Sequence, residues 1–113
     1  MVHIDNLKWG EITIDGKTYC SDMAIFWDGA IKYITKNHKL TIQEFMLLLP
    51  KKPEVLIVGI GINGAMSVDE DVKQVAEDKK IKIFEETSEK AVDIFNAMIS
   101  DEKRAVAVIH TTC

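Results

Sequence analysis

The sequence contains little cysteine and proline, and basic residues are outnumbered by acidic ones. Among 113 residues there are two cysteines and two prolines, and no apolar run approaches the roughly 20 residues that cross a bilayer. Two cysteines supply no disulfide framework, which favours the reducing cytoplasm as the location. The net charge of −4, from 14 basic and 18 acidic residues, argues against a nucleic-acid binder, which normally carries a basic face. We therefore expect a protein with no nucleic-acid partner, no membrane span and no disulfide.

Targeting signals are also missing from the printed start of the chain. The first residues, MVHIDNLKWGE, are too polar for a signal peptide, and a mitochondrial transit peptide would be rich in Arg and Ser and poor in acidic residues. A composition of 47% hydrophobic and 28% charged residues is typical of globular proteins, and a chain of this length can bury a sizeable core. We expect a single cytoplasmic domain over residues 1–113.

The first third of the chain predicts antiparallel strands joined by tight turns. Apolar and polar residues alternate from Glu11 to Asp15, which is typical of a half-buried strand. Asp15-Gly16 and Asp28-Gly29 are strong hairpin signals. Residues 10–35 are therefore expected to form two hairpins, with strands near 11–15, 17–20, 23–27 and 30–35. The sequence leaves open whether these hairpins join a main sheet or fold over it.

Residues 41–110 predict alternating helices and strands. Thr41 and Glu44 form a capping-box pattern that opens a short helix, which Pro50 ends, and residues 36–40 are expected to be a polar link. The apolar, β-branched run at 55–58 indicates a strand buried on both faces. A second capping-box pattern, Ser67 to Glu70, predicts the start of the next helix. The elements expected after it are a strand at 81–84, a helix from 87 or 88 that buries Val92, Phe95, Met98 and Ile99, and a strand at 105–110. This alternation is typical of an α/β protein with helices on the faces of a mixed sheet.

Several short motifs resemble a known family. They are Gly-x-Ile-x-Ile-Asp-Gly at 10–16, Tyr19-x-Ser21-Asp22, Asp28-Gly29, Pro53 to Gly61, and Glu86-Thr87-x-x-Ala91-Val92. In order and spacing they resemble a domain-of-unknown-function family of small α/β proteins from archaea, bacteria and mitochondria. That family includes mitochondrial complex I assembly factor three and the adipogenesis-associated domain protein. The resemblance implies a three-layer α/β fold, with a mixed central sheet and an N-terminal antiparallel β-hairpin element. It implies no established reaction, and some relatives act through protein partners.

The glycines that follow the buried strand mark the best candidate for a ligand site. The sequence from Gly59 to Gly64 spells a dinucleotide fingerprint, but the helix expected at Ser67 begins too late to direct its N-terminus at a pyrophosphate. Backbone amides near the glycines could instead hold a small anion, or the turn could serve only as a tight connection. The candidate ligand-binding residues are Gly59, Gly61, Asn63, Gly64 and Ser67, with Asp22 and Glu86 as secondary candidates.

Patterns for metal binding and catalysis are weak. His3, His38 and His110 have no paired ligand spacing, and His110 with Cys113 supplies two of the four ligands that a structural zinc requires. A Ser-His-Asp triad containing His110 would lack the G-x-S-x-G elbow. Asp22 is expected to bond its own backbone. We therefore predict no metal, no cofactor and no catalytic residue.

The sequence favours a protein-interaction or assembly factor without demonstrable catalysis. We expect Trp9, Phe26, Trp27 and Tyr33 to lie mostly in the core, although a Trp beside a hairpin turn can be exposed and anchor a partner. An edge hairpin also offers a route to a homo-oligomer. The alternative is small-molecule or anion binding, with a minor enzymatic activity as one form of it, at the glycine turn.

Overall fold

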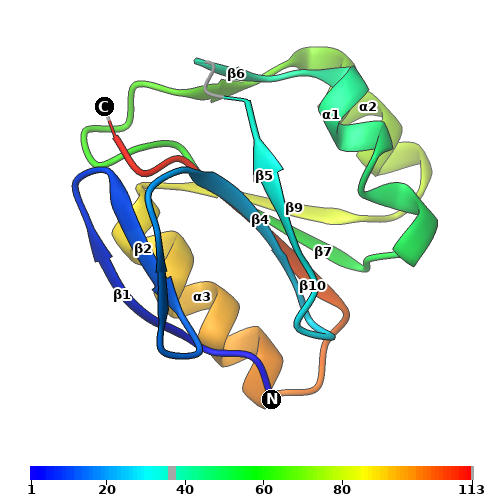
Figure 1. The fold of residues 1–113 in the computed structure, drawn as a ribbon. Coiled ribbons are helices and arrows are strands. Elements are labelled where there is room, and N and C mark those ends of the chain that lie inside the picture. Colours follow the sequence, from blue (N-terminus) through cyan, green and yellow to red (C-terminus); the bar gives the residue numbers. More distant parts are fainter. Residues whose placement is uncertain (36–37, 113) are drawn as a thin grey trace.

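A computed structural model describes residues 1–35 and 38–112. The elements, in chain order, are β1 (Ile4–Lys8), β2 (Glu11–Ile14), β3 (Lys17–Tyr19), β4 (Asp22–Phe26), β5 (Ile31–Ile34), β6 (Lys39–Leu40), α1 (Ile42–Met46), η1 (Leu49–Lys51), β7 (Val55–Gly59), β8 (Ser67–Val68), α2 (Glu70–Asp78), β9 (Lys82–Glu86), α3 (Ser88–Ser100) and β10 (Ala105–Ile109). Figure 1 shows them arranged as a compact α/β fold in three layers. None of the helices described is long and apolar enough to cross a membrane.

The middle layer is a mixed five-stranded sheet in the order β5-β4-β10-β7-β9. β10 lies at its centre, parallel to β7 and antiparallel to β4, and β9 is parallel to β7 on the far side. Every residue of β7 and β10 is buried, as expected for strands covered on both faces. The predicted central strand at 55–58 and the predicted mixed α/β sheet are therefore confirmed.

One face of this sheet is covered by α3 and by a separate three-stranded antiparallel sheet, β1-β2-β3 (Figure 1). Phe95 of α3 is fully buried against the sheet residue Ile57, in a core that also contains Ile4 and Ile12. The Asn96 side chain accepts a hydrogen bond from the Ile4 amide at 3.0 Å and donates one to the Ile4 carbonyl at 2.9 Å. α3 therefore holds β1 both through hydrogen bonds to the β1 backbone and through apolar contacts.

The opposite face is covered by α1, η1 and α2. Phe45 of α1 and Val72 of α2 are fully buried with Leu56 and Val58 of the central strand. Thr41 caps α1 as predicted, because its side chain accepts a hydrogen bond from the Glu44 amide. The two apolar cores are thus separated by the central sheet, and each helix contributes to one of them.

The two Asp-Gly hairpins form as predicted, but they belong to different sheets. β2 and β3 pair around Asp15-Gly16 in the small sheet, whereas β4 and β5 pair around Asp28-Gly29 in the main sheet. The strand β1 was not expected. Its pairing with β2 is irregular between Ile4 and Asn6, and much of it is exposed, so its sequence lacks the alternation that reveals a strand.

The predicted helix start at Ser67 is wrong. Ser67 and Val68 form the short strand β8, which pairs in parallel with β6, and the N-cap of α2 is Asp69. Backbone pairing with a distant segment therefore replaces the local capping box. β6 occupies the end of the expected polar link at 36–40, and residues 36–37 of that link lie outside the described part of the chain.

The burial of Phe95 predicts a large loss of stability on truncation. Phe95→Ala should lower the free energy of unfolding by about 3–5 kcal/mol, because it removes a fully buried ring and leaves a cavity. Urea denaturation measures the loss, with Lys90→Ala on the exposed side of the same helix as the control, expected to change it by less than about 0.5 kcal/mol. Equal effects of the two substitutions would contradict the packing described here.

Candidate functional site

A buried carboxylate lies at the carboxyl end of β10. Asp22, at the start of β4, is 6% exposed. Its Oδ2 lies 2.5 Å from His110 Nδ1, and its Oδ1 accepts hydrogen bonds from the Thr111 amide at 2.9 Å and the Thr111 hydroxyl at 3.1 Å. The prediction that Asp22 bonds its own backbone is therefore wrong: its side chain binds the residues that follow β10.

The Asp22 contact fixes the orientation of the His110 imidazole. His110 is 1% exposed, and its Nδ1 shares a hydrogen bond with Asp22 Oδ2. Nε2 is buried and has no hydrogen-bond partner in the described part of the protein. The His38 ring lies nearby, with its centroid 6.1 Å from that of His110. An oriented imidazole with an unpaired nitrogen can accept a hydrogen bond or a proton from a bound group.

Among the described residues, the two neighbouring serine hydroxyls are directed away from His110 Nε2. Ser88 Oγ donates to the His110 carbonyl at 2.5 Å, and Ser21 Oγ donates to the Asp22 carbonyl at 3.1 Å, so neither is directed at Nε2. No group of three or more His, Cys, Asp or Glu residues within 1–35 and 38–112 could hold a metal ion. Cys113, half of the weak zinc pattern, lies outside the described residues. In the described part of the chain, the Asp22–His110 pair is thus a buried polar pair to which the structure assigns no nucleophile.

Ser88 connects the pair to the glycine turn. Besides donating to His110, its hydroxyl accepts a hydrogen bond from the Gly61 amide at 2.9 Å. Gly59 lies directly against it, because a Cβ at position 59 would be 2.9 Å from Ser88 Oγ and 3.0 Å from Ser88 Cα. Glycine is therefore required at 59 by the close approach of α3, and the candidates Gly59, Gly61 and Asp22 are joined through Ser88 and His110.

Most amides of the glycine turn are bonded within the protein. The amides of Ile60, Gly61, Ile62 and Gly64 donate to the Glu86 carbonyl, the Ser88 hydroxyl, the Thr112 carbonyl and the Gly61 carbonyl, at 2.9, 2.9, 3.2 and 3.3 Å respectively. These groups hold the turn against the ends of β9, α3 and β10. An anion at this turn would have to replace those bonds.

The remaining candidates lie around the edge of this region. Asn63 and Ser67 are exposed, and the Ser67 amide donates to the His38 carbonyl at 2.9 Å. Glu86 is half-buried at the end of β9, and its carbonyl accepts from the Ile60 amide. Ser88 was not selected from the sequence. The glycine at position 59 was a usable signal, because it indicates that another segment packs closely against the end of β7.

A cavity opens beside the Asp22 carboxylate. Its volume is about 310 Å³, and its lining residues are Gly10, Cys20, Ser21, Asp22, Ile34, Thr111 and Thr112. Glu44 is within electrostatic reach of the same carboxylate. Burial raises the pKa of Glu44, the Asp22 charge raises it further, and hydrogen bonds from Thr41 act in the opposite direction. This end of the sheet therefore favours a bound group that donates hydrogen bonds over one that carries negative charge.

Comparison with known proteins identifies the family. Residues 4–110 match the family described as "Protein of unknown function (DUF498/DUF598)". The chain belongs to the DUF498 family. A conserved hypothetical protein from Pyrococcus horikoshii OT3 is 30% identical, with a TM-score of 0.88 over 97% of this chain and 98% of that one. The resemblance to a domain-of-unknown-function family is thus confirmed at the level of the family.

More distant solved structures show the same fold. A solved structure titled MT938 is 24% identical, with a TM-score of 0.80 over the whole of both chains. A protein from Bartonella henselae, described as an outer membrane protein, is 18% identical, with a TM-score of 0.85 over 97% of this chain and 94% of that one. The predicted link to complex I assembly and adipogenesis-associated relatives stays a prediction.

The buried contacts of Asp22 predict that replacing this carboxylate by an amide costs much more stability than the same change at an exposed aspartate. Asp22→Asn should lower the free energy of unfolding by about 3 kcal/mol or more, since one amide cannot accept from His110 and Thr111 together. Asp28→Asn is the matched control: this carboxylate is exposed and pairs with Lys51, so the cost should stay below about 1 kcal/mol. Similar losses for both variants in urea denaturation would show that the buried contacts do not stabilise the fold.

The raised pKa of Glu44 predicts a pH dependence. The folded protein holds the Glu44 proton more tightly than the unfolded chain does, so protonation of Glu44 stabilises the fold. This contribution to the free energy of unfolding is complete below the ordinary pKa of 4.5 and is lost as pH rises through the raised value. Glu44→Gln retains the capping pattern and cannot ionise, so its free energy of unfolding should gain on the wild type as pH increases across that range. Denaturation at a series of pH values measures the difference, and a constant offset would contradict the raised pKa.

Proposed function

We propose that this DUF498 domain is a protein-interaction module that accepts an extended segment of a partner along β5. β5 is an outer strand of the main sheet, and among the described residues it pairs with β4 alone. An open edge strand presents unpaired backbone groups that a second strand can bind. We propose no catalytic step for it. We propose the cytoplasm as its location, because a chain with two cysteines has no disulfide framework.

The register of β5 determines which backbone groups face the open edge. The Phe26 amide donates to the Ala30 carbonyl at 2.9 Å beside the hairpin turn. In an antiparallel pair, inward and outward backbone groups alternate, so Lys32 and Ile34 face β4. The backbone groups of Ile31 and Tyr33 therefore point away from the sheet, where a partner strand can reach them.

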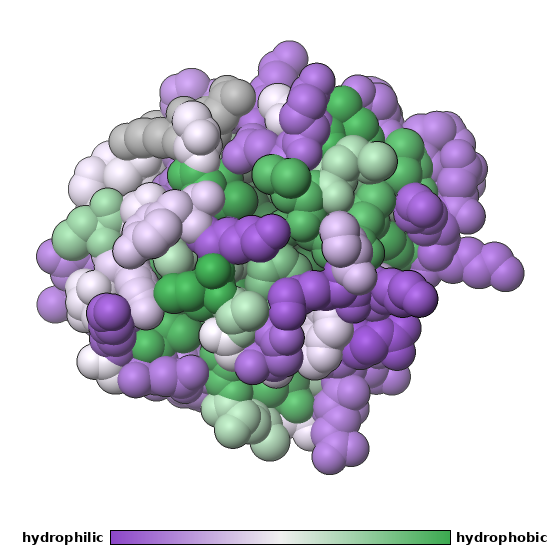
Figure 2. Space-filling view, turned by 45° about the vertical axis from the view of Figure 1, so that its right-hand side comes forward, coloured by the Kyte–Doolittle hydropathy of each residue, from purple (hydrophilic) through white to green (hydrophobic). Residues whose placement is uncertain are grey.

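The exposed Tyr33 side chain carries the proposal. The expectation that Tyr33 lies mostly in the core is wrong: it is 72% exposed, because it sits on an outer strand of the sheet. Its ring contacts the Tyr19 ring edge-on at a centroid distance of 6.3 Å. Met46 and Leu47 are also exposed, and the Leu47 carbonyl accepts a hydrogen bond from the Lys32 side chain on β5. Figure 2 shows apolar side chains gathered in patches between hydrophilic ones on one face of the molecule. Aromatic side chains of this kind commonly anchor protein contacts.

The opposite edge of the sheet is less suited to a partner strand. β9 carries Lys82, Glu85 and Glu86, and Lys73 of α2 pairs with Glu85 at 3.5 Å. Charged edge strands discourage strand addition. The combination of an open backbone and an exposed aromatic ring thus favours β5.

A second candidate function is the binding of a small molecule at the carboxyl end of β10. The unpaired His110 Nε2 and the adjoining glycine turn favour it. A ligand there would form a hydrogen bond with Nε2. We rank this function second because most amides of the turn are already bonded within the protein.

Native mass spectrometry of protein purified gently from its own host tests both functions. A partner protein should copurify in stoichiometric amount with the wild type. Tyr33→Pro should abolish the complex, since it removes an outward amide, while Tyr33→Ala should weaken it by roughly tenfold or more through loss of the ring alone. Trp9→Ala, which removes another exposed aromatic ring on the β1–β2 turn, is the control and should bind as the wild type does.

The outcomes separate the two candidates. Retention of the partner by Tyr33→Pro would exclude strand addition along β5. The second function predicts instead an added mass of a few hundred daltons, on the order of a typical small ligand. Loss of this mass in His110→Gln, with its retention in Tyr33→Pro, would establish that function.

A further inference from the structure

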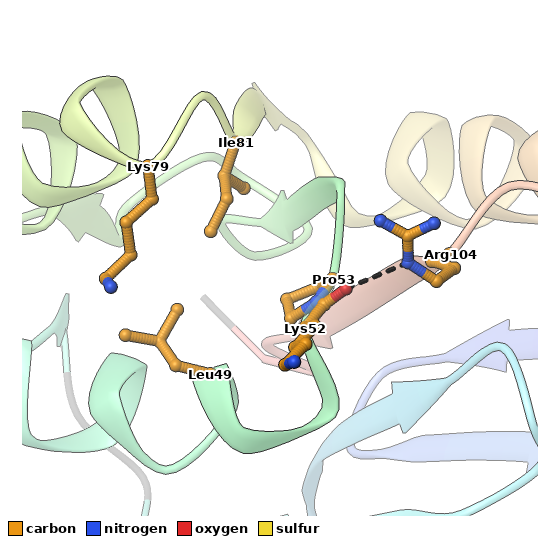
Figure 3. A pocket seen from close by; sticks show the side chains of 6 residues that line it. All are labelled: Leu49, Lys52, Pro53, Lys79, Ile81 and Arg104. Atoms are coloured by element: carbon orange, nitrogen blue, oxygen red, sulfur yellow. Dashed lines mark hydrogen bonds between the residues drawn. The ribbon is translucent and has the colours of Figure 1, made fainter.

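A cationic pocket lies at the opposite end of the parallel strands. It has a volume of about 350 Å³, and its lining residues are Leu49, Lys52, Pro53, Lys79, Ile81 and Arg104. They come from η1, from the end of α2 and from the residues that immediately precede β7, β9 and β10. Figure 3 shows the Lys79 and Ile81 side chains extending toward Leu49, with the Arg104 guanidinium beyond Pro53. Three positive charges therefore surround an apolar floor in a chain whose net charge is −4.

Arg104 is held in place by the backbone around it. Its Nε donates to the Lys52 carbonyl at 3.0 Å, and its amide donates to Glu54 Oε2 at 2.8 Å (Figure 3 shows the first of these bonds). Glu54 Oε2 also lies 3.7 Å from Arg104 Nη1, so this carboxylate is already engaged by Arg104. The guanidinium is thus a fixed part of the wall.

The two lysines have no such partners. In residues 1–35 and 38–112, neither the Lys52 nor the Lys79 ammonium group forms an ion pair, whereas Lys51, Lys73 and Arg104 do. Both side chains are exposed, and their backbones follow the ends of η1 and α2.

A lysine at the end of a helix is ordinarily explained by the negative helix terminus, and that accounts for Lys79 taken alone. It does not account for the rest of the site. Lys52 has a left-handed backbone, with φ of 56°, and its neighbour Pro53 is buried as it enters β7. Arg104 reaches the same pocket from a third segment. Convergence of cations from three segments on an apolar floor is typical of a site for an amphipathic anion.

We infer that this pocket binds a small organic phosphate. The phosphate dianion pairs with the Lys52 and Lys79 ammonium groups, and the organic part packs on Leu49, Pro53 and Ile81. A phosphomonoester matches two free ammonium groups in charge, and phosphate oxygens accept the strong hydrogen bonds that lysine donates. The pocket and β5 involve different residues, so this inference stands independently of the proposed protein-interaction function.

Phenyl phosphate is the probe that tests the inference. Titration into ¹⁵N-labelled wild-type protein at low salt should give saturable shifts at the amides of Lys52, Lys79, Ile81 and Arg104. Inorganic phosphate, which lacks the apolar part, should bind about tenfold more weakly. The double variant Lys52→Gln/Lys79→Gln should weaken phenyl phosphate binding by about tenfold or more, since it removes both unpaired charges. Lys90→Gln, an exposed lysine on α3, is the matched control and should bind as the wild type does.

Three results would overturn the inference. They are the absence of saturable shifts at these amides, equal binding by the double variant and by Lys90→Gln, and equal binding of phenyl phosphate and inorganic phosphate. Retained dispersion of the amide spectrum shows that each variant is folded. Lys79→Gln alone, at the exposed end of α2, repeats the test with a single surface substitution.

Discussion

The arrangement of the central sheet depends on the contact between Asp22 and the residues that follow β10. Asp22 and His110 are separated by 88 positions in the chain, yet their side chains meet in the interior. A buried carboxylate without partners is strongly destabilising, so β4 can join β10 only in the register that supplies His110 and Thr111. The His110 carbonyl then accepts from Ser88, which extends the same network to α3 and to the glycine turn. One acidic side chain thereby joins the antiparallel and parallel halves of the fold.

Much of the fold could be predicted because its signals are local. The Asp-Gly turns, the Thr41 capping box and the apolar run at 55–58 each depend on a few adjacent residues, and each forms as expected. The failures involve contacts between distant segments. Ser67 has the sequence of a helix cap, but pairing of β8 with β6 determines its conformation. β1 was missed because its extended conformation depends on pairing with β2 and on the hydrogen bonds of Asn96, and no local pattern reveals these contacts.

The candidate site was predictable in place but not in chemistry. The glycines indicated the carboxyl end of the central strand, and Gly59 does permit a close approach there. What approaches is Ser88 of the protein itself, because α3 packs back across that strand end. The pairing of Asp22 with His110 required the topology, since β4 and β10 become neighbours only when the sheet is assembled. Neither residue carries a motif that would identify the other.

The central position of β10 affects how the protein is made. β10 is the last of the described strands in chain order, but it lies between β4 and β7, and these two described strands do not pair with each other. During synthesis the two halves of the main sheet therefore emerge from the ribosome before the strand that joins them. Residues such as Ile25 and Ile57 stay without their final neighbour until residue 109 has left the exit tunnel. Because domains generally fold as units, these apolar strand edges are open to aggregation until β10 has emerged and joined them.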